Sequence, residues 1–141
     1  MLNSKLFYNI FMALMLLSLV GCSEKTQVAT AEPEMEISVD FQEVHLCSKI
    51  SPEMTVAYAP KGTKFYEVRL MENGQTERYL GGGRWVEDGT GIIPEGVLTR
   101  HYSGPCPPKN QKLTYSYIIT AMESENSQPL ATRIYKITPD F

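Results

Sequence analysis

The sequence predicts a mostly β fold, with one small domain built on an antiparallel sheet. Short segments alternate apolar and polar residues, Gly, Pro and Asn separate these segments, and no long stretch has a helical period. The chain has 141 residues, of which 43% are hydrophobic and 21% are charged. This length and composition are typical of a single globular domain and exclude a disordered chain.

The first predicted strand contains Ile37, Val39 and Phe41, whose apolar side chains alternate with polar ones. The predicted strands are, in order, residues 37–41, 54–58, 65–70, 76–80, 113–122 and 133–138. Between the third and fourth strands, Asn73-Gly74 predicts a hairpin with a type I′ turn, which needs positive φ. We interpret Gly81–Gly83 as a flexible or bulged loop, because no strand–glycine–helix pattern surrounds these glycines.

The amino-terminal segment predicts export. Lys5 precedes an almost wholly apolar run, residues 6–20, which is shorter than the roughly 20 residues of a membrane span. The run ends at Leu19-Val20-Gly21-Cys22, which resembles the lipobox of bacterial lipoproteins. The resemblance implies that residues 1–21 are a signal peptide and that Cys22 is the lipidated first residue of the mature protein. The alternatives are an ordinary signal peptide, or an uncleaved anchor, with an incidental cysteine.

The lipoprotein resemblance also implies a location. Ser23 follows Cys22, and in a cell with two membranes a residue other than Asp there favours the outer membrane, with the domain facing the periplasm. Acyl chains such as palmitate then hold the protein at the membrane. Residues 22–35 comprise the lipidated cysteine and a polar, flexible tether, and residues 36–141 form the β domain.

Two cysteines, Cys47 and Cys106, remain in the mature chain. In an exported protein two thiols are candidates for a disulfide, which would close a loop worth about 4 kcal/mol on the chain-entropy model. The alternative is two buried free thiols, which behave as small hydrophobic groups.

Three stretches resemble the phosphatidylethanolamine-binding protein (PEBP) family, which includes Raf-kinase-inhibitor-like proteins. They are CSKISPEMTV (Cys47 to Val56), APKGTKFYEVRLM (Ala59 to Met71) and YSGPCPP (Tyr102 to Pro108). The resemblance implies a PEBP-like domain, truncated because the family's carboxy-terminal elements are reduced to residues 131–141. Residues 113–129 also resemble part of a fibronectin type III sandwich, and we keep that fold as the alternative. A single central sheet favours the first fold, and a seven-strand sandwich favours the second.

The PEBP resemblance further implies a small pocket for anions or phosphorylated head groups. The family's pocket positions fall on six residues of this chain: Glu72, Arg84, Trp85, Tyr102, Gly104 and Pro105. Several departures count against this pocket, because the family's acidic loop and both of its pocket histidines are replaced. Each polar candidate also has a structural interpretation: Arg84 as a solvated arginine, Glu72 as its ion-pair partner, and Tyr102 as a core residue.

The remaining residues favour a non-catalytic protein. Net charge is −3, which excludes a strongly basic nucleic-acid binder. His45 and His101 are the only histidines, and neither belongs to a metal-ligand set or a nucleophile motif, so we expect no metal, no cofactor and no enzymatic activity. We expect a lipid-anchored envelope protein whose domain contacts other envelope proteins. The alternative is a small-anion or phospholipid head-group binding module.

Overall fold

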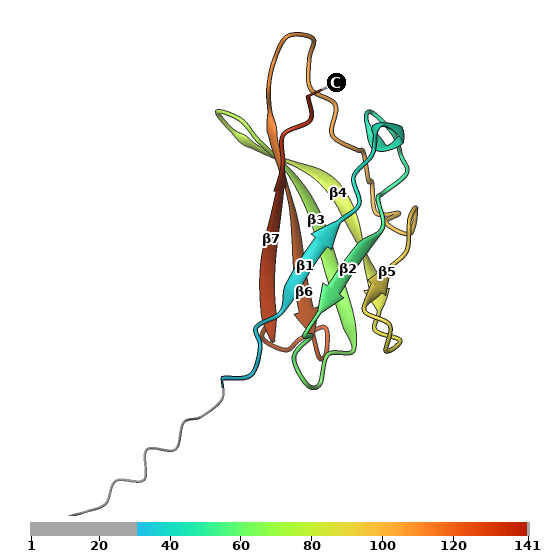
Figure 1. Ribbon diagram of the computed structural model, residues 1–141, viewed down its shortest axis with the longest axis vertical. Helices are drawn as coiled ribbons and strands as arrows, with labels where there is room; N and C mark the ends of the chain where they lie inside the picture. The colour runs from blue at the N-terminus through green and yellow to red at the C-terminus, as the bar shows by residue number, and fades with distance from the viewer. Residues whose placement is uncertain (1–30, 141) are drawn as a thin grey trace, which may run out of the picture. The chain divides into compact units, whose positions relative to one another are not determined.

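The computed structural model describes residues 31–140. The predictions for the signal peptide, for Cys22 and for the tether up to residue 30 lie outside the described residues. The elements in Figure 1 are β1 (Glu36–Val39), the 3-10 helix η1 (Glu43–His45), β2 (Met54–Ala57), β3 (Phe65–Asn73), β4 (Glu77–Val86), β5 (Ile92–Ile93), β6 (Thr114–Met122) and β7 (Ala131–Ile137). Strands dominate and η1 is the only helix of the described chain, so the mostly β prediction is confirmed.

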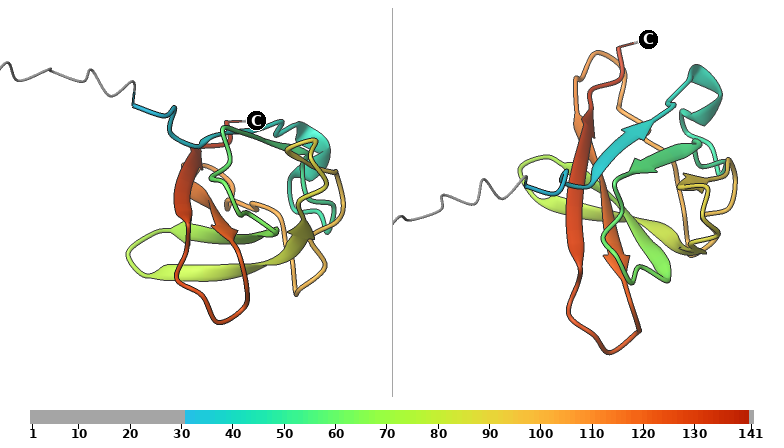
Figure 2. Two further views of the ribbon diagram at one scale, coloured as in Figure 1. Left: turned by 90° about the horizontal axis from the view of Figure 1, so that it is seen from below. Right: turned by 60° about the horizontal axis from the view of Figure 1, so that its bottom comes forward.

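The seven strands divide between two antiparallel sheets. One sheet has the order β1-β2-β5 and the other β4-β3-β6-β7. The views in Figure 2 show the sheets facing each other, and their inward side chains form one hydrophobic core. Seven strands in two facing sheets also meet the criterion stated for the fibronectin alternative. Strand number therefore does not exclude that alternative.

Strand alternation explains how the core is built. On β3, Tyr66, Val68 and Leu70 point inward and are buried, while the residues between them point outward. Met54 and Ile93 cover them from the three-stranded sheet and are also fully buried. Each such side chain contributes about 1.5–3 kcal/mol on burial, so this core is the main source of stability.

β3 and β4 form the predicted hairpin, with Asn73 paired with Glu77. The predicted turn type is wrong, because three residues connect the strands and neither Asn73 nor Gly74 has positive φ. β4 also continues well beyond residue 80, where the sequence predicted a loop. The two-residue β5 and the single turn η1 were not predicted, because such short elements have no measurable period.

The glycines Gly81–Gly83 lie inside β4, so their interpretation as a loop is wrong. The bulge is confirmed, since the register between β3 and β4 shifts between Arg69 and Met71. Gly81 has a φ of 95°, which favours glycine, and a Cβ on it would overlap the carbonyl group of His101. The glycines are needed because other backbone passes close to this strand.

Residues 100–103 run along the outer edge of β4 and protect that edge. Gly82 and Arg100 exchange two backbone hydrogen bonds of 3.0 and 2.9 Å, and the Ser103 N–H donates to the Leu80 carbonyl at 2.8 Å. Exposed strand edges are templates for pairing with other chains, so this cover limits edge-to-edge association at β4.

The described part of the chain from Glu32 onward forms one compact unit. Met35, the last residue of the predicted tether, is 3% exposed and belongs to the core. The Arg133 guanidinium donates to the Met35 carbonyl at 2.7 Å and pairs with Glu34 at 2.9 Å. The structure thus places the first core residue within the segment assigned to the tether. Within the described residues, no helix has the length and apolar character needed to cross a membrane.

Candidate functional site

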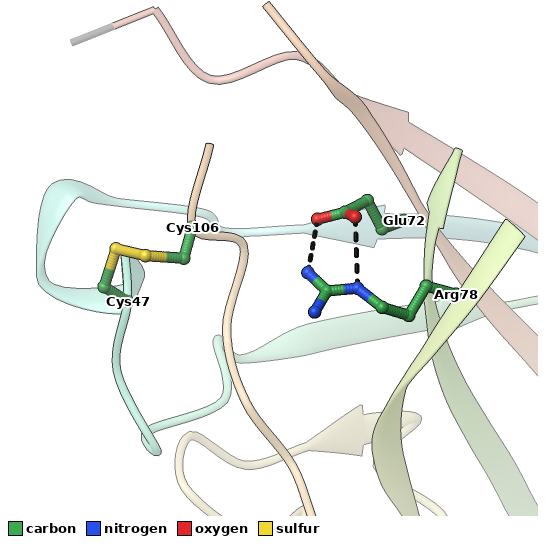
Figure 3. The surroundings of a disulfide bond; sticks show 4 residues. All are labelled: Cys47, Glu72, Arg78 and Cys106. Carbon is green, nitrogen blue, oxygen red and sulfur yellow. Dashed lines mark hydrogen bonds and ion pairs between the residues drawn. A yellow bond between two sulfur atoms is a disulfide. The ribbon is translucent and has the colours of Figure 1, made fainter. Parts of the chain in front are cut away.

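Cys47 and Cys106 form a disulfide, so the candidate bond is confirmed and the alternative of two free thiols is wrong. Their Cα atoms lie 4.5 Å apart, and 59 positions separate them in the chain. The bond joins the loop after η1 to the loop that carries Gly104 and Pro105, as Figure 3 shows for the two cysteines. Backbone bonds run alongside it, since the Cys47 N–H donates to the Pro105 carbonyl at 2.9 Å and the Gly104 N–H to the Ser48 carbonyl at 2.7 Å.

Gly104 and Pro105 therefore have a structural role here. Both are buried. A Cβ on Gly104 would overlap the carbonyl oxygen of His45, so only glycine allows the two loops to pack this closely.

Tyr102 lies in the core and not at an open ligand site. It is 3% exposed, and its hydroxyl group lies 2.9 Å from the hydroxyl group of Tyr117. Burial raises the pKa of Tyr102 to about 12, and burial also raises the pKa of Tyr117. Both rings are therefore neutral hydrogen-bonding groups at ordinary pH.

Arg84 points away from the core on the outer side of the four-stranded sheet. Its neighbour on β3 is Glu67, whose carboxylate lies 3.9 Å from the guanidinium. A second carboxylate, from Glu125, also pairs with it, and the guanidinium lies 4.3 Å from the centre of the Phe65 ring. Arg84 is thus neutralised by carboxylates of its own chain.

Trp85 faces the opposite side of β4, because neighbouring residues of a strand alternate between faces. It pairs with Tyr66 and packs against the core. Its indole N–H is buried without a hydrogen-bond partner. The two residues that the resemblance placed in one pocket therefore lie on opposite faces of the sheet.

Glu72 pairs with Arg78 and not with Arg84. Figure 3 shows the two-pronged contact, with distances of 3.1 Å from Nε and 2.9 Å from Nη2 to the two carboxylate oxygens. The Tyr115 hydroxyl is buried nearby without a hydrogen-bond partner. Burial, and then the negative charge of Glu72, raise the pKa of Tyr115 to about 12.

The six candidate residues therefore do not converge on one pocket. Tyr102 borders a hollow of about 360 Å³ together with Lys49 and His101. Gly104 borders a separate hollow of about 430 Å³ with Arg78 and His101. Arg84 lies on the outer face, away from the Tyr102 hydroxyl in the core, so these two groups cannot hold one small ligand between them.

His45 is buried with both ring nitrogens engaged. Nδ1 accepts from the Gln42 N–H at 2.9 Å, so Nε2 carries the proton and donates to Glu95 at 2.8 Å. His45 thus closes the turn of η1, and Cys47 beside it is held in the disulfide. Within residues 31–140, no group of three or more His, Cys, Asp and Glu side chains is placed to hold a metal ion.

Neither the protein-family models nor the curated proteins give a match to this chain. Solved structures do match. E. coli YbcL, described as a new member of the mammalian PEBP family, is 15% identical with a TM-score of 0.59, over 77% of this chain and 99% of that chain. CT736 of Chlamydia trachomatis, described as a homologue of phosphatidylethanolamine-binding proteins, is 15% identical with a TM-score of 0.61, over 76% of this chain and 97% of that chain.

The domain has a PEBP-like fold. The likeness of this PEBP-like domain to the two solved structures confirms the fold that the three sequence stretches implied. These likenesses do not show the implied ligand pocket, because at 15% identity they concern the fold alone.

One surface of the PEBP-like domain was not predicted from the sequence. On the outer side of the four-stranded sheet, apolar and cationic residues of neighbouring strands lie together; we call this group the outer sheet face. Its residues are Arg69, Met71, Tyr79, Ile118, Ile134 and Lys136. One signal was present in the sequence, because two of the outward positions of β6, Ile118 and Met122, are apolar.

Proposed function

We propose that this chain is a lipid-anchored lipoprotein of the cell envelope. Its PEBP-like domain makes protein–protein contacts as a non-catalytic, accessory or structural component of a membrane-associated assembly. In a cell with two membranes the anchor lies in the outer membrane and the domain faces the periplasm. Cys22 is the attachment site, and the lipobox resemblance of residues 19–22 supports it.

The ion pairing of Arg84 is the observation that supports a role in protein–protein contacts. Its guanidinium is paired with Glu125 and Glu67 and covers the ring of Phe65. A small anion at this position would have to displace carboxylates that the domain itself supplies. Tyr102, the other ligand candidate, donates or accepts within the core. A role based on the protein surface therefore has more support than one based on this pocket.

The alternative function is a small-anion or phospholipid head-group binding module. The PEBP-like fold favours it, since CT736 is described as a homologue of phosphatidylethanolamine-binding proteins. Calorimetric titration with phosphate and with phosphoethanolamine tests it on the full chain. Heat of binding that Arg84→Ala abolishes would establish the alternative, and titrations without heat would remove it.

The anchor is tested by Cys22→Ser in the cell. We expect unprocessed precursor that incorporates no labelled palmitate, because the thiol is the site of lipid attachment. Cys47→Ser serves as the matched control and should still be processed and labelled. Normal lipidation of the Cys22→Ser protein would refute the assignment.

The assembly role is tested by crosslinking the affinity-tagged full chain in its own cells and identifying what co-purifies from detergent-solubilised envelope. A recurrent set of envelope proteins in fixed ratio is the expected result. A solitary chain would contradict the proposal and shift weight to the head-group alternative.

A further inference from the structure

The two sheets differ in what their outer sides expose. On the three-stranded sheet the outward residues of β1 and β2 are polar or small: Glu36, Ser38, Thr55 and Ala57. On β5 of this sheet, one apolar side chain, Ile92, is exposed beside Thr55. On the four-stranded sheet Tyr79 is 50% exposed and Ile134 is 56% exposed. Single exposed apolar side chains are ordinary, whereas a contiguous group on one side of one sheet marks an interaction surface.

The strand registers show that the outer sheet face is contiguous. Tyr79 pairs with Met71 in one row, and Ile118 pairs with Ile134 in the next row, so the two apolar pairs lie diagonally to each other across the sheet. Arg69 pairs with Ile118 on one side and with Gly82 on the other. Because Gly82 has no side chain, Arg69 has room to extend, and its guanidinium lies 5.6 Å from the centre of the Tyr79 ring.

The charges of this face select the kind of partner. The described part of the domain is acidic overall, and Arg84 on the same side of the sheet is already paired with carboxylates. Arg69 and Lys136 are exposed, and no ion pair among residues 31–140 includes either of them. Two unpaired cations beside apolar side chains complement a surface that offers carboxylates beside apolar side chains.

A second copy of this chain fits this face poorly. A two-fold dimer places the same patch against itself, and the two unpaired charges of the patch, Arg69 and Lys136, are both positive. Positive charges of the two copies would then share one interface, and like charges in contact disfavour association. Arg69 stacked on Tyr79 has the composition of an interface hot spot, since Tyr and Arg are enriched among the residues that dominate binding energy.

We propose that the outer sheet face is the docking surface for a second envelope protein, through a segment that carries Asp or Glu next to apolar side chains. Carboxylates of that segment contact Arg69 and Lys136, and its apolar side chains cover Tyr79, Met71, Ile118 and Ile134. This proposal rests on the proposed function, because it names the surface and the chemistry by which the domain joins its assembly.

The test places a photoreactive phenylalanine analogue at Tyr79 or at Ile134 of the full-length protein in its own cells. The matched control positions are Ser38 and Thr55 on the polar outer side of the three-stranded sheet. We expect one discrete crosslinked protein at Tyr79 and Ile134 and none at the control positions. The crosslinked peptide of the partner, identified by mass spectrometry, should contain Asp or Glu.

Charge reversal then tests the chemistry. Arg69→Glu should lower the crosslinking yield at Ile134 about tenfold, as expected for the loss of a central interface residue. Lys109→Glu, an equal change of charge in a different loop, should leave the yield unchanged. Replacing the mapped partner carboxylate by Lys should restore the yield with Arg69→Glu. Thermal unfolding of the detergent-purified full chain checks that both variants keep the fold.

Several outcomes would overturn the proposal. Adducts with a second copy of this chain, adducts with lipid alone, an unchanged yield with Arg69→Glu, or crosslinking confined to Ser38 and Thr55 each contradict it. If envelope proteins co-purify but crosslink only through other positions, the assembly role stands and this surface is wrong. If nothing co-purifies and no position crosslinks, the proposed function fails as well.

Discussion

The hydroxyl groups of Tyr102 and Tyr117 lie 2.9 Å apart in the core and join the loop before Gly104 to strand β6. This contact decides the role of Tyr102. A hydroxyl that is buried and satisfied by a second buried hydroxyl stabilises the fold and is not available to a ligand.

Tyr102→Phe should destabilise the protein, because it leaves the Tyr117 hydroxyl buried without a partner. The expected cost is about 1–3 kcal/mol in the free energy of unfolding, measured by denaturant titration of the purified chain. The double variant Tyr102→Phe/Tyr117→Phe should lose less than the sum of the two single variants. Tyr58→Phe, at an exposed position, is the control and should be neutral. Additive losses would show that the two hydroxyl groups do not interact.

The protein should lose stability in strong base. The pKa values of Tyr102 and Tyr115 are raised from 10.0 to about 12 by burial, and those of Tyr66 and Tyr117 are raised too. In the unfolded chain these groups lose their protons first, so their contribution is fully present below pH 10.0 and is lost as pH rises toward 12.

The measurement is the free energy of unfolding as a function of pH, together with tyrosinate absorbance. Tyr102→Phe removes one of the shifted groups and should make the decline less steep in the same pH range. Full ionisation of all tyrosines in a chain that is still folded would contradict the buried positions of these rings.

Loss of the disulfide should weaken the fold. The bond between Cys47 and Cys106 spans 59 positions, and a loop of that size is worth about 4 kcal/mol on the chain-entropy model. The double variant Cys47→Ser/Cys106→Ser should unfold at lower denaturant concentration than the oxidised protein, and reduction should not affect it further. In the denatured, non-reduced protein, alkylation should find no free thiol at these positions. Two reactive thiols there would refute the bond.

Gly82→Ala should destabilise the protein, because its Cβ would overlap the carbonyl oxygen of Val68 on the neighbouring strand. The expected cost is about 1–3 kcal/mol, as for other overpacked positions. Gly74→Ala is the matched control, since its nearest neighbour would be 3.7 Å away and its φ is not positive. Thermal unfolding of both variants compares them directly. Equal melting temperatures would show that β4 can move away from β3 at no cost.

Much of the fold was predictable because strand periodicity is local. The predicted segments at residues 54–58, 65–70 and 113–122 coincide with β2, β3 and β6, and the Asn73-Gly74 hairpin forms where expected. The extension of β4 was missed because its glycines have no side chains and therefore no apolar period. Because Gly81–Gly83 were interpreted as a loop, Arg84 and Trp85 were not recognised as strand residues. The alternation of side chains along a strand, which places these two residues on opposite faces, therefore could not be applied.

By itself, the sequence determined the β class of this protein, most of its strands, and the two cysteines available for a disulfide. These follow from composition and from alternation over a few neighbouring residues. The tertiary structure alone decided that Tyr102 meets Tyr117, that Glu72 pairs with Arg78, and that the outer sheet face brings Arg69 beside Tyr79 and Ile118. These contacts depend on sheet register and on loop packing, which join residues far apart in the chain and leave no local pattern.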